Sequence, residues 1–255
     1  MNLLFLGDVV GAIGSNFVAE KLRSIKKFYG IDMTVINGEN SANGNGITVR
    51  SAKQLFSCGA DVITTGNHCY RRREIYDMLE NEEYLLRPAN FPEGNPGHGW
   101  CVFDLGVTRV AVINLMGTVY MEALDNPFAA ADRILEKIDT PNIIVDFHAE
   151  ATGEKKAMGF YLAGKVTAVF GTHTHVQTAD EIILDGHTGY ITDAGMCGPE
   201  LSILGVKTEI AIEKQRYHSP VKFAESENPP FINGAVIEFD HNNGKCVKIE
   251  RVIIR

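Results

Sequence analysis

Short apolar runs, each closed by a glycine or a polar residue, recur along the chain and constrain its fold more than any other feature. The runs are NLLFLGD, MTVINGEN, ADVITTGNH, RVAVINL, NIIVDFHAE and VTAVFGTHTH. Continuous apolar runs of this length predict strands that are buried on both faces. Several of the segments between them have helical spacing, so the sequence predicts an α/β protein whose first strands form a largely parallel sheet.

Two of the intervening segments carry clear helix signals. The segment 16–30 ends in a closing Gly30, and its expected buried face consists of Phe17, Leu22, Ile25 and Phe28. The segment 127–139 begins with Pro127, which suits the first turn of a helix. Both segments predict helices that pack on a sheet.

The end of the chain changes character. Residues 234–254 read as two alternating strands around an NNG turn, which predicts an antiparallel hairpin and therefore a mixed sheet system. No repeat, low-complexity stretch or long linker divides the sequence. We therefore expect one domain over residues 1–255, built as a mixed two-sheet sandwich flanked by helices.

Composition narrows the classes of partner. The net charge of −8 argues against sequence-independent binding to DNA or RNA. A small anionic substrate is still compatible with this charge if a bound metal ion makes the binding site locally positive. The five cysteines are odd in number and scattered, which argues against disulfides or a thiolate zinc site. With no signal peptide and no run long enough to span a membrane, we expect a cytoplasmic protein.

Polar residues typical of metal ligands follow five of the predicted strands. In chain order they are Asp8, Glu39 with Asn40, Asn67 with His68, His148, and His173 with His175. In open α/β sheets ligands bind outside the carboxyl ends of the strands, so these side chains should converge. The sequence predicts one polar site at that edge.

The pair His173 and His175 indicates how many ions the site holds. In extended backbone, residues two apart point to the same face and leave the chain roughly 6.6 Å apart. One ion would need both ring nitrogens within about 4 Å of each other. Two ions about 3.5–4 Å apart, as in dinuclear hydrolases, can take one histidine each. The spacing therefore favours two ions.

The donor set also bears on the kind of metal and on the chemistry. Oxygen and imidazole donors without thiolates suit Mn²⁺ or Fe²⁺ and tolerate Zn²⁺ or Co²⁺. Two divalent ions need an anion between them, for which Glu39 is the best candidate. The expected chemistry is hydrolysis by an ion-activated water, with both ions holding the phosphoryl oxygens.

Several of these residues have plainer interpretations. Asp8 could be a turn or helix-cap carboxylate, and Asn67 a turn residue. Asn43 and Asn45 are better read as loop residues than as ligands. A core role is less expected for His148, because strand alternation places Asp146 on its face.

The ordered motifs GD, NGEN, GNH, a single strand-end histidine and GTHTH resemble those of calcineurin-like metallophosphoesterases. More narrowly, INGENSANGNGIT, TTGNH, DFHAEATGEK, GTHTHVQTAD and ITDAGMCGP resemble the bacterial YmdB family over residues 8–199. The resemblance implies a four-layer metallophosphoesterase-like sandwich and a phosphodiesterase acting on cyclic nucleotides, notably 2′,3′-cyclic ones.

The resemblance also implies individual roles. One ion would be held by Asp8, Glu39, Asn40 and His175. The second would be held by Glu39, Asn67, His148 and His173, with Glu39 bridging. His68 would be the general acid or a transition-state donor. The sequence departs from the wider superfamily in two places. Val10 stands where a histidine ligand is usual. After GNH an aromatic and then an acidic residue are expected, but CYRRRE follows, which puts the substrate preference in question.

Other interpretations stay open at this point. A metal- and nucleotide-binding regulator with little turnover and a dinuclear amidohydrolase remain alternatives, although amidohydrolases tend to place His-x-His on the first strand. Arg71, Arg72 and Arg73 read as solvated surface at a helix start, with a phosphate- or RNA-facing role as the alternative. The segment 217–234 predicts either a rim loop over the site or a subunit contact, which leaves a homo-oligomer open.

Overall fold

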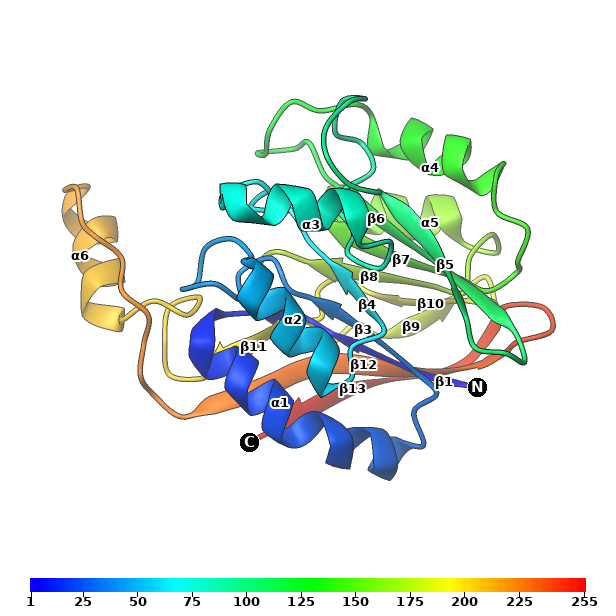
Figure 1. Ribbon diagram of the computed structural model, residues 1–255, viewed down its shortest axis with the longest axis horizontal. Helices are drawn as coiled ribbons and strands as arrows, with labels where there is room; N and C mark the ends of the chain where they lie inside the picture. The colour runs from blue at the N-terminus through cyan, green and yellow to red at the C-terminus, as the bar shows by residue number, and fades with distance from the viewer.

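Two mixed β-sheets pack face to face, and helices cover their outer faces (Figure 1). This computed structural model describes residues 1–255. The first sheet contains β1 (Asn2–Leu6), β2 (Asp8–Val9), β3 (Met33–Asn37), β4 (Val62–Thr64), β11 (Met196–Pro199), β12 (Pro230–Asp240) and β13 (Lys245–Ile254). The second contains β5 (Trp100–Asp104), β6 (Arg109–Met116), β7 (Ile143–His148), β8 (Ala168–Thr172), β9 (Ile182–Leu184) and β10 (Thr188–Ile191). All six of the quoted apolar runs form strands.

Both sheets combine parallel and antiparallel strand pairs. In the first sheet, β1, β3 and β4 are parallel, and β12 is antiparallel to both β1 and β13. In the second sheet, β6, β7, β8 and β10 are parallel, while the edge strands β5 and β9 are antiparallel. The predicted mixed architecture and the predicted hairpin of β12 and β13 are confirmed.

Apolar side chains from both sheets form the central layer of the core. Phe5 on β1 and Phe170 on β8 stack with ring centroids 4.5 Å apart. Two further apolar clusters lie outside the sheets. One packs beneath α1 (Gly11–Tyr29) and α2 (Val49–Cys58), and the other beneath α4 (Pro127–Leu135) and α5 (Thr152–Leu162). The fold therefore has the expected four layers, helix, sheet, sheet and helix.

Helix α1 ends where the sequence predicts, but its expected apolar face is partly wrong. Gly30 closes the helix in the left-handed conformation, and Leu22 and Ile25 are buried. Phe28, however, is 81% exposed. At about 100° per residue, Phe28 lies roughly 90° around the helix from the stripe centred on Val18 and Leu22, and it therefore faces solvent.

The short helices after the third apolar run also differ from expectation. Arg71 and Arg72 precede a 3₁₀ turn, Arg73–Ile75, which Arg73 opens before α3 (Tyr76–Asn81) begins. Arg71 and Arg73 are exposed, while Arg72 donates a hydrogen bond from Nε to the carbonyl of Asn45 at 3.1 Å. The cluster thus lies before the α-helix rather than on its first turn.

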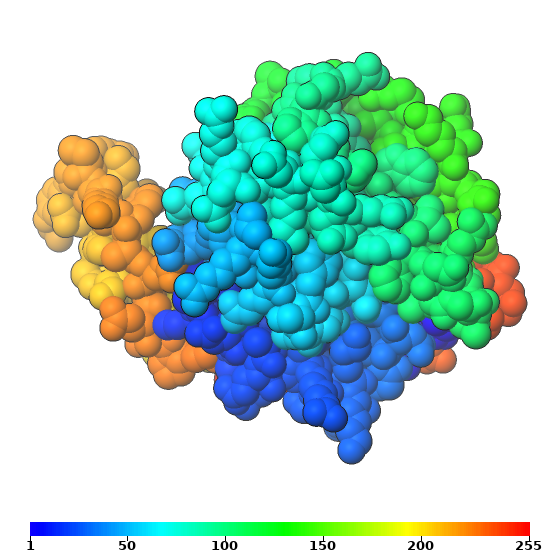
Figure 2. All heavy atoms as spheres, in the orientation of Figure 1, coloured from blue at the N-terminus to red at the C-terminus, as the bar shows by residue number.

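Helix α6 (Thr208–Tyr217) projects from the body together with the segment that follows it (Figure 2). Ile212, Tyr217 and Phe223 are exposed on this projection. The segment returns to the body at Glu225, which lies against Gly11 and Gly44. No helix of the structure has both the length and the apolar character needed to cross a bilayer.

Candidate metal centre

The polar residues predicted to converge do meet, at the carboxyl edge that the two sheets share. Glu39 and Asn40 follow β3, and Asn67 and His68 follow β4, both in the first sheet. Asp8 opens the short β2 of the same sheet. The second sheet contributes the three histidines: His148 ends β7, and His173 and His175 follow β8. The site therefore lies across the sandwich, with ligands from both sheets.

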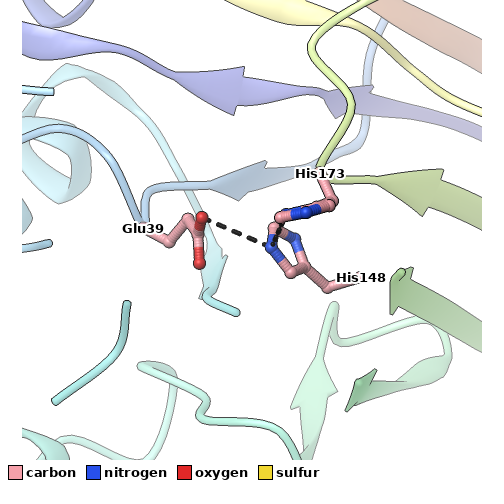
Figure 3. A group of neighbouring side chains, drawn as sticks. All are labelled: Glu39, His148 and His173. Carbon is pink, nitrogen blue, oxygen red and sulfur yellow. Dashed lines mark hydrogen bonds and ion pairs between the residues drawn. The ribbon is translucent and has the colours of Figure 1, made fainter. Parts of the chain in front are cut away.

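The ring of His148 is the centre of one half of the site. Its Nε2 atom lies 3.3 Å from Glu39 Oε1, 3.0 Å from Asn67 Oδ1 and 3.0 Å from His173 Nδ1. Figure 3 shows the side chains of Glu39 and His173 directed at this ring. Glu39, His148 and His173 offer ligand atoms within 4.8 Å of one another, a spacing that suits one ion. Four segments thus face a single point.

Asp8 forms the other half of the site and is less well satisfied. Its Oδ2 atom accepts a hydrogen bond from the backbone nitrogen of His173 at 3.0 Å. Its Oδ1 atom is buried without a hydrogen-bond partner and lies 3.8 Å from His175 Nε2 and 3.9 Å from His148 Nδ1. A buried carboxylate oxygen without a partner is costly unless a cation satisfies it.

Asn40 and His68 connect the two halves. Asn40 Nδ2 donates to Glu39 Oε1 at 2.9 Å and lies 3.3 Å from His175 Nε2, while Asn40 Oδ1 accepts from His68 Nδ1 at 2.8 Å. The amide therefore presents its nitrogen to the predicted ion position. Asn40 would ligate only after a half-turn of that amide, which exchanges the two ends.

The donors at the centre suit an ion. Gly66 lies directly against them, and a Cβ atom at this position would overlap His148 Nε2 and Glu39 Oε2. The partnerless Asp8 Oδ1 and the carboxylate, amide and imidazole donors around it are those that divalent transition metals take. Observed geometry and donor chemistry agree on a divalent cation.

The electrostatics of the site follow from burial and from close opposite charges. Burial opposes the charged form of His148, but Glu39 and Asp8 outweigh it and raise the pKa of His148 to about 9. Burial and the neighbouring His148 lower the pKa of His173 to about 3. Although burial opposes the shift, His148 and His68 hold the pKa of the Glu39 carboxyl well below its usual value. In the metal-free chain a proton on His148 therefore occupies the position that a cation would take.

The backbone of the histidine pair differs from the prediction. Strand β8 ends at Thr172, and His173 and His175 have φ values of +99° and +63° rather than extended backbone. The expectation that alternation places the two rings on one face of a strand is wrong. Instead a left-handed turn separates them, so that His173 faces His148 and His175 faces Asp8.

A buried network behind His148 fixes its ring. The hydroxyl of Thr172 donates to Asp146 at 2.7 Å and accepts from His148 Nδ1 at 2.9 Å, which leaves Nε2 directed into the site. Thr64 and Asn37 also donate to Asp146, while burial raises the pKa of its carboxyl to about 6. The network fixes which ring nitrogen a metal would bind.

A buried ion pair holds the histidine turn. Lys155 Nζ lies 2.5 Å from Asp193 Oδ2, and both side chains are 1% exposed. The same carboxylate accepts hydrogen bonds from the backbone nitrogen and the hydroxyl of Thr174, at 3.1 and 2.8 Å. Because Thr174 lies between His173 and His175, this pair stabilises the conformation that separates them.

Sequence reasoning missed Lys155 and Asp193, although both carried a signal. Lys155, Met158 and Leu162 lie three and four residues apart on the buried face of α5, so a lysine interrupts an apolar stripe. Asp193 follows the apolar end of β10, as the predicted ligands follow their own strands. A charged residue in either place indicates a buried partner.

Asp8 and Asn67 do not have the plain turn or cap roles, whereas Asn43 and Asn45 are loop residues. Asp8 is not the cap of α1, because the N-cap is Val10 and no side chain caps the helix. Asn67 directs its side-chain oxygen at His148 rather than into its own turn. Asn43 has a φ of +51° in a tight loop, and Asn45 accepts from Arg72 only through its carbonyl.

Known proteins of similar sequence and structure support one family. A curated relative from Bacillus subtilis, named 2′,3′-cyclic-nucleotide 2′-phosphodiesterase, is 46% identical over 100% of this chain and 97% of its own. A solved structure from Thermus thermophilus, described as a hypothetical protein, has a TM-score of 0.94 at 36% identity and covers 99% of this chain and 98% of that one.

A second solved structure agrees with the first. It is described as a novel phosphatase from Mycoplasma pneumoniae, with a TM-score of 0.95 at 35% identity over 100% of this chain and 93% of that one. Residues 4–252 also match a family described as YmdB-like protein. With likeness over nearly its whole length, the chain belongs to the YmdB-like protein family.

Proposed function

We propose that the chain is a phosphodiesterase that uses two divalent metal ions to hydrolyse cyclic nucleotides, 2′,3′-cyclic nucleotides above all. The observation that carries the proposal is the convergence of Glu39, Asn67 and His173 on His148 Nε2, beside Gly66, whose lack of a side chain lets the backbone approach these donors. The activity named for the Bacillus subtilis relative supports the choice of substrate.

The two halves of the site would hold one ion each. Glu39, Asn67, His148 and His173 would hold the first, and Asp8, Glu39, Asn40 and His175 the second. Glu39 would lie between them, because its Oε1 atom contacts both His148 and Asn40. When bound, such ions lower the pKa of a coordinated water and hold the phosphoryl oxygens.

The donors favour iron or manganese. Carboxylate, amide and imidazole ligands without a thiolate suit Fe²⁺ or Mn²⁺, while Zn²⁺ or Co²⁺ would also bind. All five cysteines are free and none is among the candidate ligands. The same unpaired cysteines support a cytoplasmic location, and the apolar cluster shared by both sheets supports treating residues 1–255 as one domain.

His68 would supply the proton for the leaving oxygen. Its Nδ1 atom donates to Asn40 Oδ1 at 2.8 Å, and its backbone nitrogen donates to Glu39 Oε2 at 3.2 Å, so the residue is fixed beside the ligands without being one. Its Nε2 atom would protonate the ribose oxygen as the phosphorus–oxygen bond of the ring breaks. Once the amide of Asn40 has turned to ligate an ion, its oxygen would leave His68, and the backbone hydrogen bond to Glu39 would hold the acid in place.

The substrate we propose is small and anionic. The exposed side chains of Arg71 and Arg73 near the loop of Asn45 give weak support for RNA, and the net charge of −8 argues against DNA. The apolar projection around α6 keeps a homo-oligomer as a secondary proposal.

One assay tests the proposed activity most directly. The protein is stripped with a chelator, supplied with Mn²⁺ and offered a panel of 2′,3′- and 3′,5′-cyclic nucleotides. We expect turnover of 2′,3′-cyclic nucleotides to disappear on stripping and to return with Mn²⁺, and we expect elemental analysis to give two metals per chain. A protein that holds two metals but turns over none of the panel would instead be a regulator.

A further inference from the structure

A pocket of about 340 Å³ opens on the flank of His175, outside the ligand cluster. It lies between the turn after β8, the loop that follows β11 and the hairpin of β12 and β13. Figure 1 shows the open end of this hairpin on the side from which α6 projects. The residues that matter for its chemistry are His175, Gln177, Leu204, Phe231 and Asn233.

The amide of Asn233 has an unpaired end that faces this pocket. Asn233 is 5% exposed, and its Oδ1 atom is fully buried. Its Nδ2 atom is not buried and donates no hydrogen bond, so the N–H donors are the end that a ligand can reach. The amide of Gln177 is held in place, because its Nε2 atom donates to the carbonyls of Gly234 at 2.8 Å and Val252 at 3.2 Å.

The pocket is contiguous with the proposed reaction centre through one ring. His175 directs Nε2 toward Asp8 Oδ1, and its Nδ1 donates to the carbonyl of Leu204 at 3.2 Å. A group attached to a phosphodiester beside Asp8 would therefore reach the pocket along the flank of His175. The pocket is placed to receive the part of the substrate that does not react.

The charges around the pocket favour a neutral occupant. Arg251 Nε donates to Glu181 at 2.9 Å, and Arg255 Nε donates to Glu200 at 2.8 Å, so the nearby guanidinium groups are already paired with carboxylates. Phe231 lies on the same face of β12 as Asn233, two residues away, and lines the same space. An aromatic ring beside an unpaired amide N–H suits a planar group that carries hydrogen-bond acceptors.

We propose that this pocket binds the nucleobase of the cyclic-nucleotide substrate, which rests on the function proposed above. Asn233 Nδ2 donates a hydrogen bond to a ring nitrogen or carbonyl oxygen on the edge of the base, and Phe231 offers its ring to the face of the base. The pocket thus makes the enzyme prefer nucleotides over cyclic phosphodiesters that lack a base.

The test compares two substrates in one protein preparation. Asn233→Leu removes the amide at nearly constant volume, and kcat/KM is measured for each 2′,3′-cyclic nucleotide and for glycerol 1,2-cyclic phosphate, which has no base. We expect at least one nucleotide to lose about tenfold, mainly through a higher KM, because one hydrogen bond is lost. Turnover of glycerol 1,2-cyclic phosphate should not change. The ratio of the two is independent of how much protein is folded.

Two further variants keep the test decisive. Phe231→Leu should lower the same ratio a few-fold, because it removes the ring but keeps an apolar side chain. Asn142→Leu is the matched control, since Asn142 is a buried amide with an unpaired oxygen at the opposite end of β7. Asn142→Leu should leave the ratio unchanged.

The outcomes separate this inference from the proposed function. If the wild-type protein hydrolyses neither kind of substrate, the proposed function fails. If it hydrolyses nucleotides but Asn233→Leu and Phe231→Leu keep the wild-type ratio, the pocket does not bind the base. Equal wild-type turnover of glycerol 1,2-cyclic phosphate and the nucleotides would overturn the pocket inference alone.

Discussion

The two halves of the candidate metal centre are built differently. Around His148, Glu39, Asn67 and His173 already lie within hydrogen-bonding or ion-pairing distance of one nitrogen. Around Asp8, a buried carboxylate oxygen has no partner, and His175 stands 3.8 Å away. The first half is thus held together by the protein itself, whereas the second is satisfied only when a cation is present.

The cause lies in the elements that carry each half. His148 ends a central strand, β7, which is paired on both sides and supported by Asp146 and Thr172. Asp8 belongs to the two-residue strand β2, and His175 to a left-handed turn. A central strand fixes its last side chain by packing, while a turn depends on contacts from elsewhere.

Loss of His68 should have the largest effect and should leave both halves intact. His68→Ala is expected to lower turnover by roughly 10²–10⁴-fold, the usual scale of general acid catalysis, because no other group would protonate the leaving oxygen. Elemental analysis should still give the wild-type metal content. Unchanged turnover would remove His68 from catalysis, and lost metal would make it part of the ligand network.

Two isosteric variants, one in each half, should differ by about 3 kcal/mol in the free energy of unfolding of the metal-free protein. At pH 6, Glu39→Gln should lower the free energy of unfolding of the metal-free protein by about this amount, because it leaves the protonated His148 buried without its carboxylate. Asp8→Asn should leave that stability unchanged or raise it, since it removes a buried charge with an unpaired oxygen. Both variants should bind less metal.

Denaturant unfolding of the chelated proteins measures this difference, with wild-type protein as the reference. Equal destabilisation by the two variants would show that the halves do not differ in the way described. Because both substitutions conserve shape, a difference in packing cannot produce the expected contrast.

The dependence of metal binding on pH should also differ between the halves. In the metal-free chain the pKa of His148 is raised to about 9. This group therefore stabilises the metal-free fold fully below its unfolded pKa of about 6.5, and the contribution is lost as the pH rises through about 9. An ion bound to His148 must displace this proton, so its affinity should rise about tenfold per pH unit from 7 to 9.

Titration of the chelated protein with Mn²⁺ across this pH range checks the slope. The ion on the Asp8 side should show a shallower dependence, because it displaces no proton from His148. Two ions with the same steep slope would contradict the assignment of His148 to one half only.

Thr174→Val should produce the smallest effect and should act on both halves equally. The variant removes the 2.8 Å hydrogen bond from the hydroxyl to Asp193, worth about 1 kcal/mol, while the backbone contact remains. Because the turn supplies one histidine to each half, both ions should bind several-fold more weakly. Thr174→Ser is the matched control and should bind both as the wild type does; weakening of one ion alone would show that the turn does not couple them.

The strands and their closing residues could be predicted because they depend on local patterns. Apolar runs closed by Asp8, Asn40 or His148 are visible in the sequence, and the rule that parallel strands present their ends together brings these residues to one edge. The exposure of Phe28 was missed because the true stripe is centred on Val18 and Leu22, which the four chosen apolar residues did not define.

Features that depend on distant contacts could not be predicted in this way. The left-handed turn at His173 and His175 is stabilised by Asp193 and Lys155, which lie some twenty residues away on either side. The pocket at Asn233 exists only because the hairpin and the loop after β11 approach His175. Such features follow from tertiary packing, for which local periodicity carries no signal.

Gly66 shows how little separates a working centre of this kind from an inert one. Since even a methyl group there would collide with His148 and Glu39, alanine at this position should block the cation without changing a single ligand. A point substitution that keeps every candidate ligand could thus silence the enzyme while leaving its surface, and whatever recognises that surface, unaltered.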